Sequence, residues 1–170
     1  MIKILVINTV RFKLNGISAV IKNYYRAMDK ENIKMDFLAI DDPSEEYQAF
    51  FEENNLNCFV QYKKNIVDYF KGIIKLCRQE KYDIVHIHEN SATAVLELQI
   101  AKWLGIKARI IHNHSSCCQH KILNKLLLPG YRRSFTQAIA CSIEAGEWLY
   151  GETQFTILRN AIKVEPFIFN

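Results

Sequence analysis

Apolar runs of strand length alternate with helically spaced apolar residues along most of this chain, and this alternation constrains the fold more than any other feature. Ile2–Ile7 is a mostly apolar run of strand length, and the apolar residues from Ile17 to Met28 recur at helical spacing. Further strands are predicted at Met35–Ile40, Cys58–Tyr62, Asp83–His88, Ala108–His112, Ala138–Cys141 and Phe155–Leu158. Further helices are predicted at Ser44–Asn54 with Ser44 as its cap, after a cap at Asn65, at Ser91–Leu104, within Lys121–Phe135 with a break near Pro129 and Gly130, and at Ile143–Leu149.

Strands that are apolar on both faces and separated by helices indicate a parallel sheet with helices on both sides. Because crossovers are right-handed, we expect an α/β fold with a doubly wound, mainly parallel, Rossmann-like sheet of about seven strands. The chain has 170 residues and 49% of them are hydrophobic, which suits one well-packed domain and is too little for two. Residues 1–170 are therefore predicted to form a single domain.

Ligands of doubly wound sheets bind beyond the carboxyl ends of the strands, near the point where strand order reverses. Four segments are predicted to lie there: Asn8–Gly16, Asp41–Pro43, His88–Ser91 and His112–Cys118. The first segment closes on Asn15 and Gly16, which tolerate a left-handed backbone, and the helix that follows can bind phosphate or a sugar hydroxyl at its N-terminus. The sequence contains no G-x-G-x-x-G dinucleotide motif, and an ordinary turn between strand and helix is the alternative interpretation.

Two H-x-H motifs, at His86–His88 and His112–His114, close two of the predicted strands. Residues two apart on a strand share a face, so each pair can point together. Cys117 and Cys118 follow nearby, but the spacing is unusual for zinc, and no metal is expected. We expect one histidine of each pair to pack in the sheet and the one at the strand tip to face the cleft as a neutral hydrogen-bonding group. Glu89 either orients or deprotonates an acceptor hydroxyl, or is a solvent-facing or capping acid.

Positive charge is concentrated in one part of the chain, although the net charge is only +4. No Asp or Glu occurs between Leu98 and Ile143, a stretch with seven Lys or Arg residues. Four of them alternate with apolar residues as in a membrane-surface segment and are predicted to contact an anionic partner: Lys121, Lys125, Arg132 and Arg133. The alternative is a core-packed helix with a solvated basic face. No nucleic-acid partner is expected, since few aromatic residues lie among these charges.

The five cysteines are an odd number and lie mostly inside apolar runs, so they are expected to be free thiols in a reducing compartment. No signal peptide is recognised before Ile2, and no segment approaches the roughly 18 apolar residues that a membrane span needs. We therefore expect a cytoplasmic protein, with peripheral binding to the inner face of the plasma membrane as a further hypothesis.

Taken in order, these motifs resemble family 4 retaining glycosyltransferases, which build capsular polysaccharides, exopolysaccharides and lipid-linked glycans. The resemblance covers essentially the whole chain and rests on Asn15–Ile21, Asp83–His88, Arg109–Ser115, Ala138–Gly151 and Ile157–Phe167. Two positions depart from the family pattern. Asn15 precedes Gly16 where the family usually has Gly-Gly, so this loop is expected to be more selective. Ala161 follows Asn160 where Asn-Gly is usual, so a left-handed backbone is not expected at Ala161.

The resemblance implies the N-terminal, acceptor-side half of a two-domain GT-B enzyme that transfers a hexose-type sugar from a nucleotide-sugar to a glycan or lipid-linked acceptor in cell-surface polysaccharide biosynthesis. It implies His114 as the catalytic cleft histidine, and it implies the following substrate-binding residues: Asn15, Gly16, His88, Glu89, Ser115 and Ser142. No cofactor or metal is implied beyond the nucleotide-sugar co-substrate. The donor is held mainly by a C-terminal domain that these 170 residues lack, so the isolated chain is expected to be inactive.

Two other hypotheses remain open. A stand-alone, flavodoxin-like binding or regulatory module would bind a flavin or nucleotide tightly without any further domain. One subunit of a two-polypeptide glycosyltransferase would become active only with a separate protein that supplies the donor half.

Overall fold

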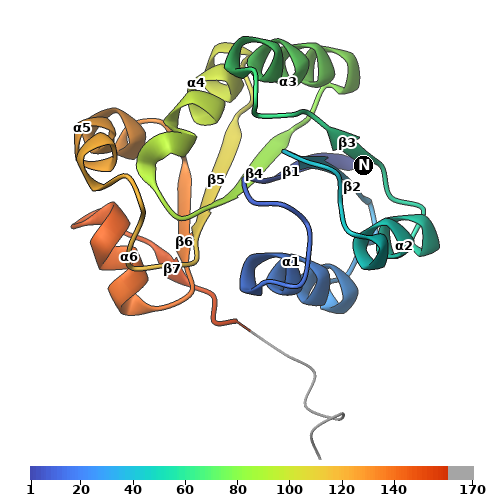
Figure 1. The fold of residues 1–170 in the computed structure, drawn as a ribbon, viewed down its shortest axis with the longest axis horizontal. Helices are drawn as coiled ribbons and strands as arrows, with labels where there is room; N and C mark the ends of the chain where they lie inside the picture. The colour runs from blue at the N-terminus through green and yellow to red at the C-terminus, as the bar shows by residue number, and fades with distance from the viewer. Residues whose placement is uncertain (161–170) are drawn as a thin grey trace, which may run out of the picture.

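The computed structural model of this chain describes residues 1–160 and contains a seven-stranded, all-parallel sheet in the order β3-β2-β1-β4-β5-β6-β7 (Figure 1). The strands are β1 (Ile2–Asn8), β2 (Ile33–Ala39), β3 (Cys58–Val60), β4 (Ile84–Glu89), β5 (Ala108–Asn113), β6 (Gln137–Ala140) and β7 (Thr156–Ile157). The helices are α1 (Gly16–Ala27), α2 (Glu45–Glu53), α3 (Ile66–Glu80), the 3-10 turn η1 (Ala92–Ala94), α4 (Val95–Trp103), α5 (Lys121–Arg132) and α6 (Ile143–Tyr150). This architecture confirms the predicted doubly wound, Rossmann-like α/β fold.

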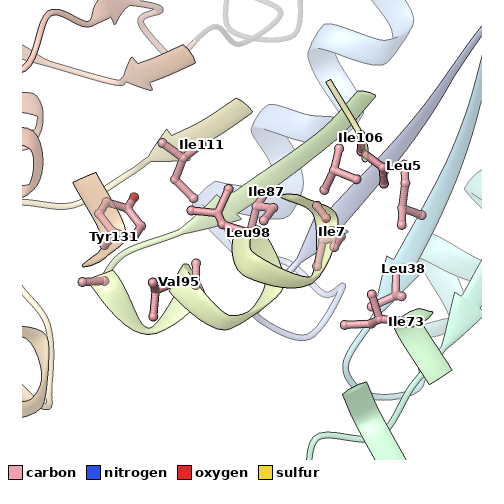
Figure 2. Packing of buried hydrophobic residues seen from close by; sticks show 14 of the residues in the cluster. Leu5, Ile7, Leu38, Ile73, Ile87, Val95, Leu98, Ile106, Ile111 and Tyr131 are labelled. Carbon is pink, nitrogen blue, oxygen red and sulfur yellow. The ribbon is translucent and has the colours of Figure 1, made fainter. Parts of the chain in front are cut away.

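Helices cover both faces of the sheet, with α1 and α2 on one side and α3, α4 and α5 on the other (Figure 1). On the α4 side, Leu98 packs in one cluster with Ile87 of β4 and Ile111 of β5, and all three are fully buried (Figure 2). The α1 side holds a separate, largely aromatic cluster made of Phe12, Tyr25, Phe37, Tyr47, Phe50 and Phe51, among others. Each fully buried side chain of this size contributes about 1.5–3 kcal/mol, so the two clusters hold the sheet between its helices.

Strand order reverses between β1 and β4, because the chain proceeds from β1 outward through β2 to β3 and then returns to β4 on the opposite side of β1. Thr9, the first residue after β1, donates hydrogen bonds from its amide (3.2 Å) and from Oγ1 (2.9 Å) to the carbonyl oxygen of His88 on β4. His88 is in turn paired in register with Asn8 on β1 and His112 on β5. The carboxyl ends of these three central strands therefore lie side by side at the reversal point, where ligands of this fold bind.

Pro129 does not break the helix, contrary to the prediction of a break near Pro129 and Gly130. Helix α5 runs without interruption from Lys121 to Arg132 and has Pro129 inside it. Proline removes one backbone hydrogen bond, but packing holds the helix on both sides of it. Tyr131 is fully buried in the core, and Ser134 Oγ donates to the carbonyl oxygen of Gly130 at 2.6 Å. Tertiary burial thus overrides the local preference of proline.

Two predicted helix starts also differ from the structure. Ser44 occupies the N-cap position of α2, but its side chain makes no capping hydrogen bond, whereas Asn65 caps α3 as predicted by accepting from the amides of Val67 and Asp68. The helix predicted from Ser91 is divided into η1 and α4, because the Asn124 side chain of α5 accepts the amide hydrogen of Ala92 at 2.6 Å and stabilises a separate tight turn. Strands β3 and β7 are shorter than predicted.

Candidate functional site

The loop after β1 ends in a side-chain cap rather than in a left-handed turn. Asn15 has an extended backbone (φ −150°), and its Oδ1 accepts the amide hydrogen of Ser18 at 2.9 Å, while its Nδ2 donates to the Arg11 carbonyl oxygen. Gly16 has no positive φ, and a Cβ added there would meet no atom within 4 Å. Neither position adopts the left-handed backbone that Asn and Gly tolerate. What glycine provides at Gly16 is open space at the N-terminus of a twelve-residue helix.

The two H-x-H motifs come together as one cluster of four imidazoles on neighbouring strands. His86 and His88 lie on β4, His112 lies on β5, and His114 follows directly after β5. Adjacent rings in this cluster have centroids 4.2 to 5.1 Å apart. His112 is 1% exposed and His114 is half-buried, as predicted for the second pair. The prediction is wrong for the first pair: His88, at the strand tip, is 4% exposed and more buried than His86, because Thr9 and His114 cover it.

The closest polar contact in the cluster joins His88 to His114. Nδ1 of His88 lies 2.8 Å from Nε2 of His114, so one ring donates a hydrogen to the other. Such a bond fixes the tautomer and the orientation of both rings. His114 is thus held by His88 at the end of β5, whereas His88 itself is too buried for direct contact with a large substrate.

All four clustered imidazoles are neutral at physiological pH. Burial, reinforced by neighbouring imidazoles, lowers the pKa of His86 to about 4 and that of His112 to about 2, and burial lowers the pKa of His114 to about 4. Burial, reinforced by the other three rings, also holds the pKa of His88 well below its usual value. A neutral imidazole carries one hydrogen-bond donor and one acceptor, which suits a group that binds hydroxyls.

Among residues 1–160, three of these histidines form a group that could hold a metal ion. The ligand atoms of His86, His88 and His112 lie within 4.8 Å of one another. In a tetrahedral zinc shell with bonds of about 2.0–2.1 Å the nitrogen atoms lie about 3.3 Å apart, a separation that this upper limit allows. The rings of His86 and His112 are stacked, with an interplanar angle of 5° and centroids 5.7 Å apart.

A polar cavity of about 720 Å³ opens at the carboxyl ends of the central strands. It is lined by Thr9, Val10, Lys63, Glu89, Asn90, Ser91, Thr93, Ser115, Cys117, Cys118, Gln119 and His120. Two of the predicted substrate-binding residues, Glu89 and Ser115, belong to this lining. Ser115 directly follows His114, but none of the four clustered histidines lines this cavity; His86, His88 and His112 line a separate cavity of about 240 Å³ between the sheet and α1. The predicted segment Asp41–Pro43 contributes no residue to this lining.

Glu89 is a buried carboxyl group in the wall of the cavity. It is 9% exposed, and its Oε1 accepts the amide hydrogen of Asn90 at 2.6 Å. Burial raises the pKa of Glu89, while the hydrogen bonds from Asn90 and Thr9 and the nearby Lys63 ammonium oppose the shift. A carboxyl group with a raised pKa is a stronger base than a solvated one. Because Glu89 is buried, the alternative of a solvent-facing loop acid is wrong.

Lys63 is a cavity residue that sequence reasoning missed, whereas Thr9 and Val10 belong to the predicted segment Asn8–Gly16. Lys63 Nζ lies 3.2 Å from Oε1 of Glu97, which is 1% exposed and also accepts a hydrogen bond from the Tyr69 hydroxyl. This buried ion pair fixes a cation at the cavity wall. No motif marks Lys63 in the sequence.

Ser142 has a structural task in this chain. Its hydroxyl caps α6 by accepting the amide hydrogen of Ala145 at 3.2 Å, and it does not line the polar cavity. Asn113, which is fully buried, donates from Nδ2 to the carbonyl oxygens of Ser115 (2.8 Å) and Ala145 (2.6 Å). Asn113 thereby ties the loop after His114 to α6 and sets the position of Ser115.

The four predicted anion-contacting cations do not share one environment. Lys121, Lys125 and Arg133 are exposed on or beside α5. Arg132 is half-buried and donates from Nε to the carbonyl oxygen of Leu149 at 3.2 Å, so it joins α5 to α6. Three of the four cations therefore remain available to a partner.

Comparison with known proteins identifies the family. The family described as "Glycosyltransferase Family 4" matches residues 14–162, which is most of the chain. This chain belongs to glycosyltransferase family 4. A curated relative of the family 4 chain is "Putative glycosyltransferase EpsF" of Bacillus subtilis (strain 168), which is 24% identical over 170 aligned residues that cover 91% of this chain and 44% of the relative.

Solved structures share the fold of the family 4 chain. MurG of Acinetobacter baumannii superposes with a TM-score of 0.64 at 12% identity, over 99% of this chain and 48% of MurG. Anabaena Alr3699/HepE, solved in complex with UDP, superposes with a TM-score of 0.71 at 12% identity, over 96% of this chain and 45% of HepE. The fold is that of the N-terminal half of a GT-B protein, and the chain spans less than half the length of these relatives.

No helix among residues 1–160 combines the length and the apolar character that crossing a membrane requires. The family segment Ile157–Phe167 and the predicted backbone at Ala161 extend outside the described residues.

Proposed function

We propose that this family 4 chain is the acceptor-binding half of a retaining glycosyltransferase. The complete enzyme transfers a hexose-type sugar from a nucleotide-sugar to a glycan or lipid-linked acceptor in cell-surface polysaccharide biosynthesis, on the cytoplasmic side of the membrane. Membership of the family supports glycosyl transfer, and the hydroxyl- and amide-rich cavity supports a sugar acceptor.

The observation that carries this proposal is the polar cavity at the reversal point of the sheet, where β4 and β5 also end in the His88–His114 pair. Ser115 lines the cavity and directly follows His114, so in this proposal the acceptor occupies the cavity and the transferred sugar lies against His114 at the end of β5. Buried, neutral and oriented groups of this kind recognise hydroxyls without a competing charge. In this proposal His114 contacts the transferred sugar, and Glu89 accepts a hydrogen bond from the acceptor hydroxyl.

Asn15 and Gly16 lie at the start of α1, where the helix N-terminus offers backbone amides and open space to a phosphate or hydroxyl. The donor nucleotide is bound mainly by a second domain, which accounts for the inactivity proposed for the isolated chain. The reaction requires no metal or other cofactor in this account. In this proposal Ser142 contributes by capping α6 rather than by touching substrate.

Chemical-shift mapping of the ¹⁵N-labelled chain tests the proposal. Methyl glycosides of glucose, galactose and N-acetylglucosamine at millimolar concentration should shift the amide resonances of Glu89, Asn90 and Ser115. UDP-glucose and flavin mononucleotide should bind weakly or not at all. A Ser115→Ala variant should weaken the glycoside response, whereas the exposed Gln154→Ala variant should not change it.

Micromolar binding of flavin mononucleotide by the chain alone would instead establish the flavodoxin-like module. If the glycosides shift only amide resonances of residues outside the cavity, the acceptor does not bind in the cavity. Activity that arises only when a separate donor-binding protein is added would favour the two-polypeptide enzyme.

A further inference from the structure

The α1 side of the sheet carries three imidazoles on two neighbouring strands. Residues two apart on a strand share a face, so His86 and His88 of β4 both face α1, whereas Ile87 between them packs on the α4 side. The same alternation holds on β5, where His112 is paired in register with His88 and Ile111 packs on the α4 side. The strand pairing therefore brings the three imidazoles together beneath α1.

A cavity of about 240 Å³ lies between these imidazoles and α1. The three histidines share its lining with mainly apolar side chains: Ile4, Val6, Val20, Ile21, Tyr24, Tyr25, Met28, Met35, Ile84, Ile110 and Leu158. The Tyr24 hydroxyl also donates to the carbonyl oxygen of Arg159 at 2.5 Å, so the residues after β7 reach α1 beside this cavity. It shares no lining residue with the polar cavity and is a separate site.

Two of the histidines have buried nitrogen atoms that lack a partner. His112 is 1% exposed, and neither of its ring nitrogens forms a hydrogen bond with any residue in the range 1–160. Nε2 of His86 is likewise buried and without a partner in that range. Buried polar groups without a hydrogen bond are destabilising, and they are rare unless water or a ligand satisfies them. These nitrogen atoms therefore call for a polar group inside an otherwise apolar cavity.

The charge of the lining favours a neutral molecule in the cavity. Within the part of the chain that the structure describes, no Lys, Arg, Asp, Glu or Cys lines it. Burial lowers the pKa of all three imidazoles, so they are uncharged at neutral pH. An ion would lose its hydration here without gaining a counter-charge, whereas a neutral molecule would not.

We propose that this cavity binds a small neutral molecule with a hydroxyl group on an apolar body of about the size of a benzene ring. A hydroxyl both donates and accepts hydrogen bonds, which matches the neutral imidazole of His112. The apolar body would contact α1 at residues such as Val20 and Met28. An apolar cavity of about 150 Å³ holds benzene, so the larger volume here suffices for a phenol. His88 lines the cavity and bonds to His114, so the bound molecule lies behind the proposed substrate contact.

Phenol and toluene are matched probes of this inference, because they have nearly the same size and differ by a hydroxyl and a methyl group. In titrations of the ¹⁵N-labelled 170-residue chain, phenol should bind with a Kd below about 1 mM. Toluene is more hydrophobic, yet it should bind at least about fivefold more weakly, because it leaves the imidazole nitrogens unpaired. Benzoate should bind at least about tenfold more weakly than phenol. Phenol should shift the amide resonances of Val20, Ile21 and His112.

Two variants separate the polar and the apolar part of the site. His112→Phe replaces the imidazole by an apolar ring and should reverse the preference, so that toluene binds more tightly than phenol. Val20→Phe adds a ring inside the cavity and should weaken both probes by at least about tenfold, because protein interiors are close-packed.

His120→Phe and Val67→Phe make the same two replacements at exposed positions outside this cavity. Both controls should bind the probes like the parent chain, and circular dichroism should show that all four variants are folded. If His112→Phe does not fold, the comparison of phenol with toluene in the parent chain and in Val20→Phe still decides the question.

Three results would overturn the inference. The first is tighter binding of toluene than of phenol by the parent chain. The second is unchanged phenol binding in folded Val20→Phe, and the third is the absence of detectable binding of either probe, which would leave the buried nitrogens to water. None of these results depends on the glycoside titration, which tests the polar cavity and the proposed function.

Discussion

Nδ1 of His88 lies 2.8 Å from Nε2 of His114, and this contact joins the buried histidine near the end of β4 to the half-buried histidine after β5. His88 is also fixed from behind, since Thr9 donates two hydrogen bonds to its carbonyl oxygen. The proposed substrate contact at His114 therefore depends on a residue that substrate does not reach. His88 is a positioning residue in this account.

Replacement of His88 should impair His114 indirectly. In an enzyme with a donor-binding domain, His88→Ala should lower kcat by about tenfold to a hundredfold, the range seen when residues that orient functional histidines are removed. His88→Asn places an amide near the lost Nδ1 and should restore part of the rate with little change in KM. Steady-state kinetics of the two variants checks this, and equal losses in both would point to a purely structural role.

The histidine cluster should make the stability of the chain depend on pH. Its four folded-state pKa values lie below the unfolded value of about 6.5, so the unfolded chain binds more protons as pH falls below that value. The free energy of unfolding should be fully retained above about pH 6.5 and should fall towards pH 4, by up to about 1.4 kcal/mol per pH unit for each imidazole. The raised pKa of Glu89 acts in the opposite direction, but it is one group against four.

Urea unfolding at pH 7.5, 6 and 5 measures this slope. His86→Gln removes one buried imidazole and should reduce the slope by about 1.4 kcal/mol per pH unit between pH 6 and 5. The exposed Gln154→Ala variant should leave it unchanged. An identical slope in His86→Gln would show that the cluster does not control the acid sensitivity of the chain.

Much of the fold could be predicted from the sequence, because strand-length apolar runs and caps such as Asn65 are local signals. The sequence also showed that β4 and β5 each end near a pair of histidines. Burial of His88 was not, since it depends on Thr9 and on the ring of His114 across the sheet. Lys63 was missed because its partner Glu97 is 34 residues away, and no local pattern reveals such a pair.

The uninterrupted helix through Pro129 shows the same limit of local reasoning. Proline lacks the amide hydrogen that would bond to the carbonyl oxygen of Lys125, and the burial of Tyr131 compensates for this loss. Pro129→Ala should therefore stabilise the chain, by up to about 3 kcal/mol. Thermal unfolding checks this against the exposed Lys125→Ala variant, which should change stability by less than about 0.5 kcal/mol. A Pro129→Ala variant that is less stable than the parent would mean that proline is required where α5 packs.

Metal removal should not affect the proposed reaction. Dialysis against a chelator should leave the turnover of an enzyme with a donor-binding domain unchanged. Elemental analysis of the 170-residue chain should give zinc well below one ion per chain. Stoichiometric zinc that is lost in His112→Asn would assign a metal to the histidine cluster and would contradict the no-metal proposal.

The most direct test of the account is the turnover of His114→Ala in an enzyme that combines this chain with its donor-binding domain. Sugar transfer from the nucleotide-sugar should fall by at least about tenfold, because an oriented neutral hydrogen-bonding group is removed from the reacting sugar. Circular dichroism should show the fold intact, since His114 lies after β5 and is only half-buried. Unchanged turnover in a folded His114→Ala enzyme would contradict the assignment of this cleft as the site of transfer.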